Sequence, residues 1–319
     1  MSLSARASTA PRIAVLIPCY NEEVAVPRVV AAFRAALPDA AIYVYDNNSA
    51  DGTRRVAEAA GAIVRTETQQ GKGHVVRRMF ADIEADAYVL VDGDDTYDAG
   101  AVPEMLRLLF DERFDMVTGV RVTDAAGAYR PGHRFGNAVL TGMVRWVFGN
   151  RITDMLSGYR VFSRRFVKSF PALAAGFETE TEFTVHALEL RLPVGELRTA
   201  YKERPVGSAS KLNTWRDGLR ILRTILLLVQ RERPLMFFSA VGAVLFAAAI
   251  LLALPLLATF LETGLVPRLP TAVLATGLAL LSFLSLASGL ILDTVSRGRL
   301  EAKRLAYLAL PAPADGRDR

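Results

Sequence analysis

Residues 87–95 read AYVLVDGDD, a short apolar run that ends in a group of carboxylates. The apolar run Ala87–Val91 has the length of one buried strand. Carboxylates follow it at Asp92, Asp94 and Asp95, and a fourth comes at Asp98. Like charges repel one another, so such a group at a strand end indicates either a bound cation or a solvated turn.

The segments before this strand alternate short apolar runs with helical periodicity. Strands are predicted at 12–18, 41–46 and 62–65, and helices at 22–37, 54–61 and 73–85. This alternation predicts parallel βαβ units and an α/β, doubly wound sheet, in which ligands bind at the carboxyl ends of the strands. Three polar motifs occupy such ends: PCYNEE (18–23), DNNSADGT (46–53) and DGDD (92–95). Solvated turns would be scattered over both edges, so the convergence favours a ligand site.

Composition narrows the class of protein. The chain has 319 residues, 51% of them hydrophobic, and a net charge of +5. Its positive mean hydropathy indicates that part of it lies in lipid. Cys19 is the only cysteine, which excludes an intramolecular disulfide and a multi-cysteine metal site. The first apolar run, 13–17, is too short for a signal peptide, so the N-terminal part is expected in the cytoplasm.

Two charge-free runs, Leu235–Leu261 and Leu269–Leu292, are each long enough to cross a bilayer as a helix. Arginines and lysines gather before the first run and after the second, whereas the connecting loop holds only Arg268. The positive-inside rule therefore places both termini in the cytoplasm and predicts a two-helix hairpin in the inner membrane. This topology accounts for much of the basic charge, so no nucleic-acid partner is required.

Residues 213–233 show apolar side chains at helical spacing with arginines mostly on the other side. This pattern is typical of an amphipathic helix in the membrane interface. A helix packed on the soluble domain would show the same pattern, and both interpretations stay open. The predicted organisation is a flexible N-terminus (1–11), a catalytic domain (12–212), the interface helix (213–233), the hairpin (234–293) and a basic cytoplasmic tail (294–319).

The Asp92-x-Asp94 spacing suits a hard divalent cation such as Mg²⁺ or Mn²⁺, which prefers carboxylate oxygens and shares its coordination with substrate phosphates. Cations that could meet those phosphates follow in the sequence: Arg121, Arg134, Arg160, Arg204 and Lys211. The segment GKGHVVR (71–77) lacks the third glycine of a dinucleotide fingerprint and does not follow the first strand.

Six motifs stand in a characteristic order: IPCYNEE, YDNNSADGT, GKG, DGDD, DMLSGYR and ERPVGSASKL. In this order they resemble glycosyltransferase family 2, and most of all its polyprenyl-phosphate branch, which includes dolichyl-phosphate mannose synthase and dolichyl-phosphate glucosyltransferase. The resemblance covers roughly residues 12–212. It implies a GT-A fold, a Rossmann-like mixed sheet, and a nucleotide-sugar donor.

The resemblance also implies roles for individual residues. The donor nucleotide would contact Pro18, Tyr20, Glu22, Asp46, Asp51, Lys72 and Asp92. The metal would lie between Asp92 and Asp94, with Asp94 the direct ligand. Phosphates of donor and acceptor would meet Arg121, Arg134, Arg204 and Lys211, and the acceptor segment would contain Asp154, Ser157 and Arg160. Catalysis would rest on Asp94, Asp154, Arg121, Arg134 and Arg160.

The sequence departs from the family at two positions. Asn47 replaces a second aspartate, which leaves UDP against GDP undecided, and Thr96 replaces a metal-binding glutamine of some relatives. The acidic stretch FETETEF (177–183) has no assigned role: Glu180 either holds a basic residue or belongs with Glu178 and Glu182 to a solvated face.

The predicted function is inverting transfer of a hexose-type sugar from a nucleotide diphosphate to a polyprenyl phosphate, for cell-envelope glycans. A lipid phosphate is already anionic and needs no strong base, so catalysis would be mainly electrostatic. The alternatives are a transferase acting on a glycolipid hydroxyl with Asp154 as base, a polysaccharide synthase, and a non-catalytic nucleotide-sugar-binding membrane protein. The sugar, the lipid length and a homo-oligomeric state stay open.

Overall fold

The structure is a computed structural model that describes residues 10–122, 142, 153–174, 176, 178–202, 227, 230 and 233–311. The chain divides into two compact units: Met1–Gly218 with Lys303–Arg319, and Leu219–Ala302. The first is called the catalytic unit below and the second the hairpin unit. The predicted interface helix at 213–233 and the N-terminal segment 1–9 lie almost entirely outside the described residues.

The catalytic unit contains a seven-stranded mixed sheet with the order β3-β2-β1-β4-β6-β5-β7. Its strands are β1 (Ile13–Cys19), β2 (Ala41–Asp46), β3 (Ile63–Thr66), β4 (Ala87–Leu90), β5 (Met116–Val122), β6 (Arg160–Ser163) and β7 (Val194–Ala200). Strands β1 to β4 pair in parallel, as predicted. Strand β6 runs antiparallel between β4 and β5, and β5 pairs in parallel with β7.

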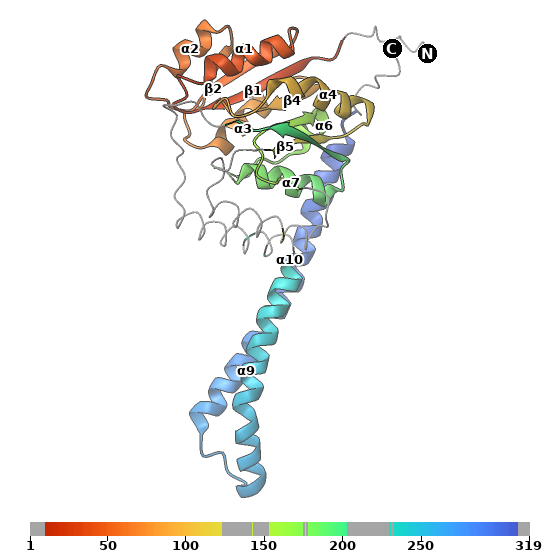
Figure 1. The fold of residues 1–319 in the computed structure, drawn as a ribbon. Coiled ribbons are helices and arrows are strands. Elements are labelled where there is room, and N and C mark those ends of the chain that lie inside the picture. The colour runs from red at the N-terminus through yellow and green to blue at the C-terminus, as the bar shows by residue number, and fades with distance from the viewer. Residues whose placement is uncertain are drawn as a thin grey trace, which may run out of the picture. The chain divides into compact units, whose positions relative to one another are not determined.

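Helices cover both faces of this sheet (Figure 1). They are α1 (Val26–Ala36), α2 (Thr53–Ala59), α3 (Lys72–Asp82), the short 3₁₀ helix η1 (Ala99–Ala101), α4 (Val102–Asp111), α6 (Arg164–Ser169) and α7 (Thr179–Leu190). The predicted helices at 54–61 and 73–85 match α2 and α3 closely. The helix predicted from residue 22 begins later, at Val26, because Pro27 favours the first turn of a helix.

Alternating side chains of the central strands build two cores. Val15 and Ile17 of β1 pack with Phe33 of α1 and Met105 of α4 in one buried cluster. The other face holds an aromatic cluster in which Phe80 of α3, Phe166 of α6 and Phe183 of α7 surround Phe162 of β6. Burial on both faces explains why β4 is apolar throughout, as central parallel strands generally are.

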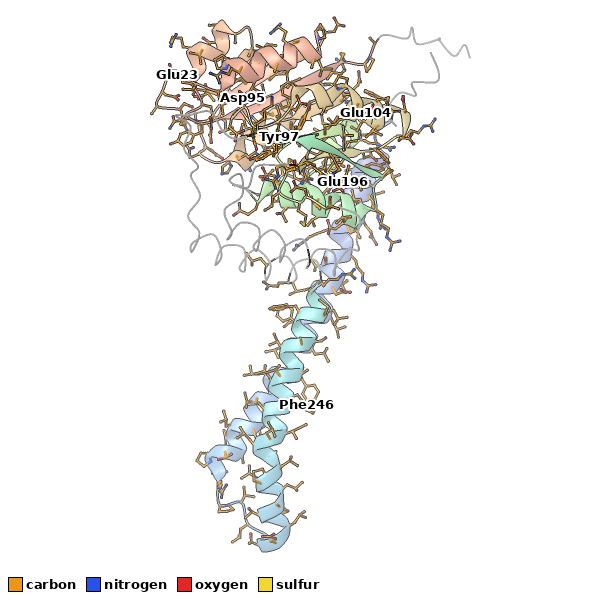
Figure 2. All side chains as sticks on the ribbon, in the orientation of Figure 1. Glu23, Asp95, Tyr97, Glu104, Glu196 and Phe246 are labelled. Atoms are coloured by element: carbon orange, nitrogen blue, oxygen red, sulfur yellow. The ribbon has the colours of Figure 1, made fainter. Side chains whose placement is uncertain are left out.

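The hairpin unit consists of α9 (Pro234–Thr263) and most of α10 (Leu269–Leu308). Both helices are long and apolar enough to cross a membrane. They pack through small and polar residues: Ser282 Oγ donates to the Gly242 carbonyl and Ser285 Oγ to the Phe238 carbonyl, each at 2.9 Å. Phe246, labelled in Figure 2, packs its ring against Phe283. Close contacts of this kind are common between helices in lipid.

Helix α10 continues beyond the predicted span, to Leu308, so the segment predicted as a tail begins as helix. Its last turns belong to the catalytic unit. There Tyr307 donates its hydroxyl to Asp115 at 2.8 Å, and Lys303 forms an ion pair with Glu189 at 2.6 Å. Asp115 is fully buried and also accepts hydrogen bonds from Ser163 and Arg165. The end of α10 is therefore part of the catalytic unit's own hydrogen-bond network.

Candidate active site

The loops that follow β1 and β2 are tied together by hydrogen bonds. Asn21 receives one from Ala50 and donates its backbone N–H to Ser49, and the Glu22 N–H donates to Thr53. Asn21 and Asn48 adopt positive φ values of 54° and 63°, a conformation that asparagine tolerates better than most residues. The two predicted donor motifs thus form one continuous surface at the carboxyl edge of the sheet.

Asp46 and Asp51 have different surroundings in this surface. Asp46 is 7% exposed, and its Oδ1 is buried and has no hydrogen-bond partner among the described residues. Asp51 accepts bonds from the Thr53 N–H and hydroxyl and from the Glu23 N–H. Burial raises the pKa of Asp51, but the bonds from Thr53 outweigh that effect and the pKa is lowered. Asp51 therefore fixes the shape of the loop, and Asp46 Oδ1 is the oxygen that could accept a hydrogen bond from a ligand.

Asn47 has a structural role that the sequence did not reveal. Its amide donates to the carbonyls of Glu67 and Gln69, at 2.9 and 2.8 Å, and its Oδ1 accepts from the Gly71 N–H at 2.7 Å. An aspartate could accept from Gly71 but could not donate to the two carbonyls. The side chain is 3% exposed, so Asn47 fixes the loop that leads into α3.

The DGDD motif lies directly after β4, as predicted. Asp94 is 3% exposed, and its Oδ1 accepts the Thr96 hydroxyl at 2.6 Å. Asp95 adopts a positive φ of 60° in the turn, and Asp98 caps η1 by accepting from the Gly100 N–H. Asp95 is therefore a turn residue, and Asp98 is a helix-start residue.

Lys72 lies at the centre of a charge cluster that joins Asp92 to Glu180. The Lys72 ammonium, on the first turn of α3, forms ion pairs with Asp92 and with Glu180 of α7. Burial alone would lower the pKa of Lys72, but the two carboxylates outweigh it and raise the pKa well above its usual value. Glu180 Oε2 is buried and forms no hydrogen bond with any residue that the structure describes. Glu180 thus holds a basic residue, which is one of the two roles that the sequence left open for it.

Gly158 shows how closely the acceptor segment approaches the acidic motif. A Cβ at this position would overlap the Asp92 carboxylate. The Gly158 N–H donates to the hydroxyl of Tyr97 at 2.9 Å. Tyr97 is labelled in Figure 2. Tyr97 in turn packs against Tyr201, whose ring lies 5.6 Å from the Arg121 guanidinium carbon. These contacts bring the segment 153–160 and the end of β5 to the DGDD loop.

Arg121 and Asp154 form a two-pronged ion pair. Arg121 Nε and Nη2 donate to the two oxygens of Asp154 at 2.8 and 2.7 Å. Burial would raise the pKa of Asp154, but the bonds and charge of Arg121 outweigh it, so the pKa is lowered. A carboxylate with a lowered pKa is a weak proton acceptor, which does not suit a general base.

Arg160 and Ser157 are in the protein interior. Arg160 is fully buried and donates to the carbonyls of Ser157 and Met155, and burial lowers its pKa to about 10. Ser157 donates its hydroxyl to the Gly119 carbonyl at 2.6 Å. These contacts do not fit direct binding of a substrate by either side chain. Both residues instead fix the backbone that carries Asp154 and Gly158.

Three predicted phosphate-binding residues, Arg134, Arg204 and Lys211, lie outside the described residues. Tyr20 is 38% exposed beside the donor loops, and Pro18 lies in β1. The structure therefore brings together Asp46, Lys72, Asp92, Asp94, Arg121 and Asp154 at one edge of the sheet. Sequence reasoning did not find Tyr97, Tyr201 and Gly158, whose residue types carry no distinguishing spacing.

The carboxylates of the DGDD motif fit a divalent cation. Asp92 and Asp94 offer the oxygens that Mg²⁺ or Mn²⁺ prefers, and the described part of the chain has no third His, Cys, Asp or Glu grouped with them for a metal. A cation held by two carboxylates takes its other ligands from water and substrate phosphates. Thr96 orients Asp94 through its hydroxyl. The donor set fits a cation that arrives with a diphosphate.

Comparison with known proteins gives consistent results. A family model described as "Glycosyl transferase family 2" matches residues 14–170. Glycosyltransferase AglJ of Haloferax volcanii is 34% identical over 236 residues, which are 73% of this chain and 77% of the relative. A dolichyl-phosphate hexose transferase of the same organism is 26% identical over 69% of this chain and 95% of the relative.

A solved structure shows the same fold. Glucosyl-3-phosphoglycerate synthase from Mycobacterium tuberculosis, crystallised with Mn²⁺ and UDP-glucose, superposes with a TM-score of 0.54. The match covers 69% of this chain and 78% of that chain at 23% identity. The mixed sheet is therefore the GT-A fold, and the chain belongs to glycosyltransferase family 2.

Proposed function

We propose that this family 2 glycosyltransferase transfers a hexose-type sugar from a nucleotide diphosphate sugar to a polyprenyl phosphate, with inversion at the anomeric carbon. The observation that carries the proposal is the Arg121–Asp154 pair. A hydroxyl acceptor requires a base, whereas a phosphate acceptor is already ionised and requires a cation to hold it. Asp154 is committed to Arg121, so the pair suits the phosphate.

The glutamates that could replace Asp154 as a base are also engaged. Glu180 is paired with Lys72. Glu182 accepts the backbone N–H groups of Leu173 and Ala174, both at 2.9 Å. Each of these carboxylates is already engaged with partners inside the catalytic unit. This supports an acceptor that needs no deprotonation.

The donor would bind along the carboxyl edge of the sheet. Asp46 Oδ1 would accept an N–H of the base, and Lys72 would donate to the diphosphate. Bound between Asp92 and Asp94, Mg²⁺ or Mn²⁺ would supply Lewis-acid neutralisation of the departing nucleoside diphosphate. Arg121 would orient the acceptor phosphate, with Asp154 fixing its guanidinium plane. Arg134, Arg204 and Lys211 are proposed as further phosphate contacts.

Membrane attachment agrees with a lipid acceptor. Both helices of the hairpin unit could span a bilayer, and a relative is named for transfer to dolichyl phosphate. We propose an inner-membrane enzyme with the catalytic unit and both termini in the cytoplasm, which acts in cell-envelope glycan synthesis. An acceptor whose tail stays in the bilayer then needs to present only its phosphate to the site.

The test is a donor panel with the purified full chain in detergent. Labelled UDP- and GDP-sugars are each added with Mn²⁺ and a short polyprenyl phosphate, and label that enters the organic phase is counted. Transfer from one donor, abolished by EDTA, is the expected result. Transfer to a dephosphorylated polyprenol or to a glycolipid, but not to the lipid phosphate, would overturn the proposal.

A further inference from the structure

We propose that Glu180 is a positioning residue, which holds the Lys72 ammonium at the place where the donor diphosphate binds. The inference rests on the proposed function, since it assumes a nucleotide diphosphate donor. It gives a role to one of the three glutamates in the stretch 177–183, and it makes α7 part of the donor site.

Three elements that are distant in the sequence meet at this lysine. Lys72 begins α3, Asp92 follows β4, and Glu180 lies on the first turn of α7. The Lys72 side chain is 9% exposed and that of Glu180 is 6% exposed, whereas that of Asp92 is 30% exposed. Glu180 is thus the buried partner of the lysine, and Asp92 is the partner that opens toward ligands.

The two carboxylates serve different purposes. An ammonium group has three N–H donors, and among the described residues it gives one to Asp92 and one to Glu180. A third donor is left for a phosphate oxygen. When Asp92 takes part in binding a metal–diphosphate, Glu180 still provides the counter-charge that a buried lysine needs to stay ionised. Glu180 therefore keeps its ion pair with Lys72 while the Lys72 ammonium donates to the phosphate.

Removal of the Glu180 charge separates this role from simple electrostatics. Loss of a negative charge near an anion site should tighten binding of a nucleoside diphosphate, because repulsion is reduced. Loss of a positioning partner should weaken it, because Lys72 would then be held by Asp92 alone, and Asp92 competes with the phosphate for the ammonium. The two explanations therefore predict changes of opposite sign in the Kd for the nucleoside diphosphate.

The experiment uses the full chain in detergent with Mn²⁺, and UDP and GDP are each titrated by calorimetry. For the nucleotide that the wild type binds, Glu180→Gln should raise the Kd about tenfold, the loss expected for one charge-assisted hydrogen bond. Glu178→Gln is the matched control, since it removes the same charge two residues earlier, and it should leave the Kd within about twofold of wild type. An unchanged or lower Kd for Glu180→Gln would overturn the proposal.

Two further variants test whether Glu180 acts through Lys72. In a Lys72→Met background, Glu180→Gln should produce no additional weakening, because a positioning residue acts through the residue it holds. Equal weakening in both backgrounds would also overturn the proposal. Thermal unfolding checks that each variant is folded, and Glu180→Asp, whose carboxylate is one methylene shorter, should give an intermediate Kd. A wild type that binds neither nucleotide would instead refute the proposed function itself.

Discussion

The replacement Asp154→Asn separates a positioning carboxylate from a general base. Asparagine keeps the shape of the side chain and one carbonyl oxygen, but it loses the charge and one of the two acceptors that face Arg121. Hydrogen bonds to charged groups contribute about 1.5 to 3 kcal/mol each. Both side chains are mostly buried, at 14% exposed for Arg121 and 8% for Asp154, so solvent compensates little of the loss.

We therefore expect a loss of about 2 to 3 kcal/mol of transition-state stabilisation, equivalent to a fall in kcat/KM of roughly 30- to 150-fold. The assay measures initial rates of label transfer to a polyprenyl phosphate at several acceptor concentrations. Arg121→Lys, which keeps the charge but cannot bind two oxygens side by side, should fall by a similar factor.

The pH profile decides between the two roles. The pKa of Asp154 is lowered in the folded protein, so its ion pair is present above the unfolded value of about 3.9 and is lost only as pH falls below it. Between pH 5 and 9 the wild-type rate should follow the second ionisation of the acceptor phosphate, whose pKa is about 6. Asp154→Asn should lower the whole profile without changing its shape. A variant that loses the low-pH limb of the profile would identify Asp154 as the base and refute the reasoning.

Three other replacements test the surroundings of the site. Asn47→Asp places a charge against two backbone carbonyls and should destabilise the catalytic unit by about 3 kcal/mol, which a lower Tm would show. Asn48→Asp, at an exposed position, is the control. An equal loss of stability in Asn48→Asp would refute the role of Asn47 in fixing the loop before α3. Gly158→Ala forces the Asp92 carboxylate to move and should weaken Mn²⁺ binding measured by spin resonance, whereas Gly277→Ala meets no atom within 4 Å and should be neutral; unchanged Mn²⁺ affinity in Gly158→Ala would exclude Asp92 as a ligand. Tyr307→Phe removes one of the donors to Asp115 and should lower the Tm by about 2 to 4 °C, and an unchanged Tm would show that the end of α10 does not stabilise the catalytic unit.

The strands and helices before residue 92 were predictable because local periodicity determines them. Each apolar run there is short, and polar loops bound it on both sides, so β1 to β4 and α2 to α3 follow from sequence spacing. The antiparallel strand β6 could not be predicted, because its place between β4 and β5 depends on pairing with residues far away in the chain. The end of α10 was also missed, since hydropathy marks only the apolar part of a helix.

The site was predictable at the level of motifs and not at the level of contacts. Asp92 and Asp94 were found because an acidic motif after an apolar strand is a local signal. The pairing of Arg121 with Asp154 joins residues 33 positions apart, and no spacing rule connects them. Glu178, Glu180 and Glu182 alternate in the sequence without a pattern that separates them. Helix α7 nevertheless directs Glu180 to Lys72 and Glu182 to the backbone N–H groups of Leu173 and Ala174.

The chemical linkage of the product tests the central claim most directly. The purified chain is incubated with Mn²⁺, the active donor and a polyprenyl phosphate, and the lipid is followed by phosphorus NMR. Transfer to the phosphate converts a phosphomonoester resonance into a phosphodiester resonance, at the rate at which sugar enters the lipid, and this is the result we predict. A lipid that gains sugar while its phosphomonoester resonance stays unchanged would contradict the account, because the sugar would then be on a hydroxyl.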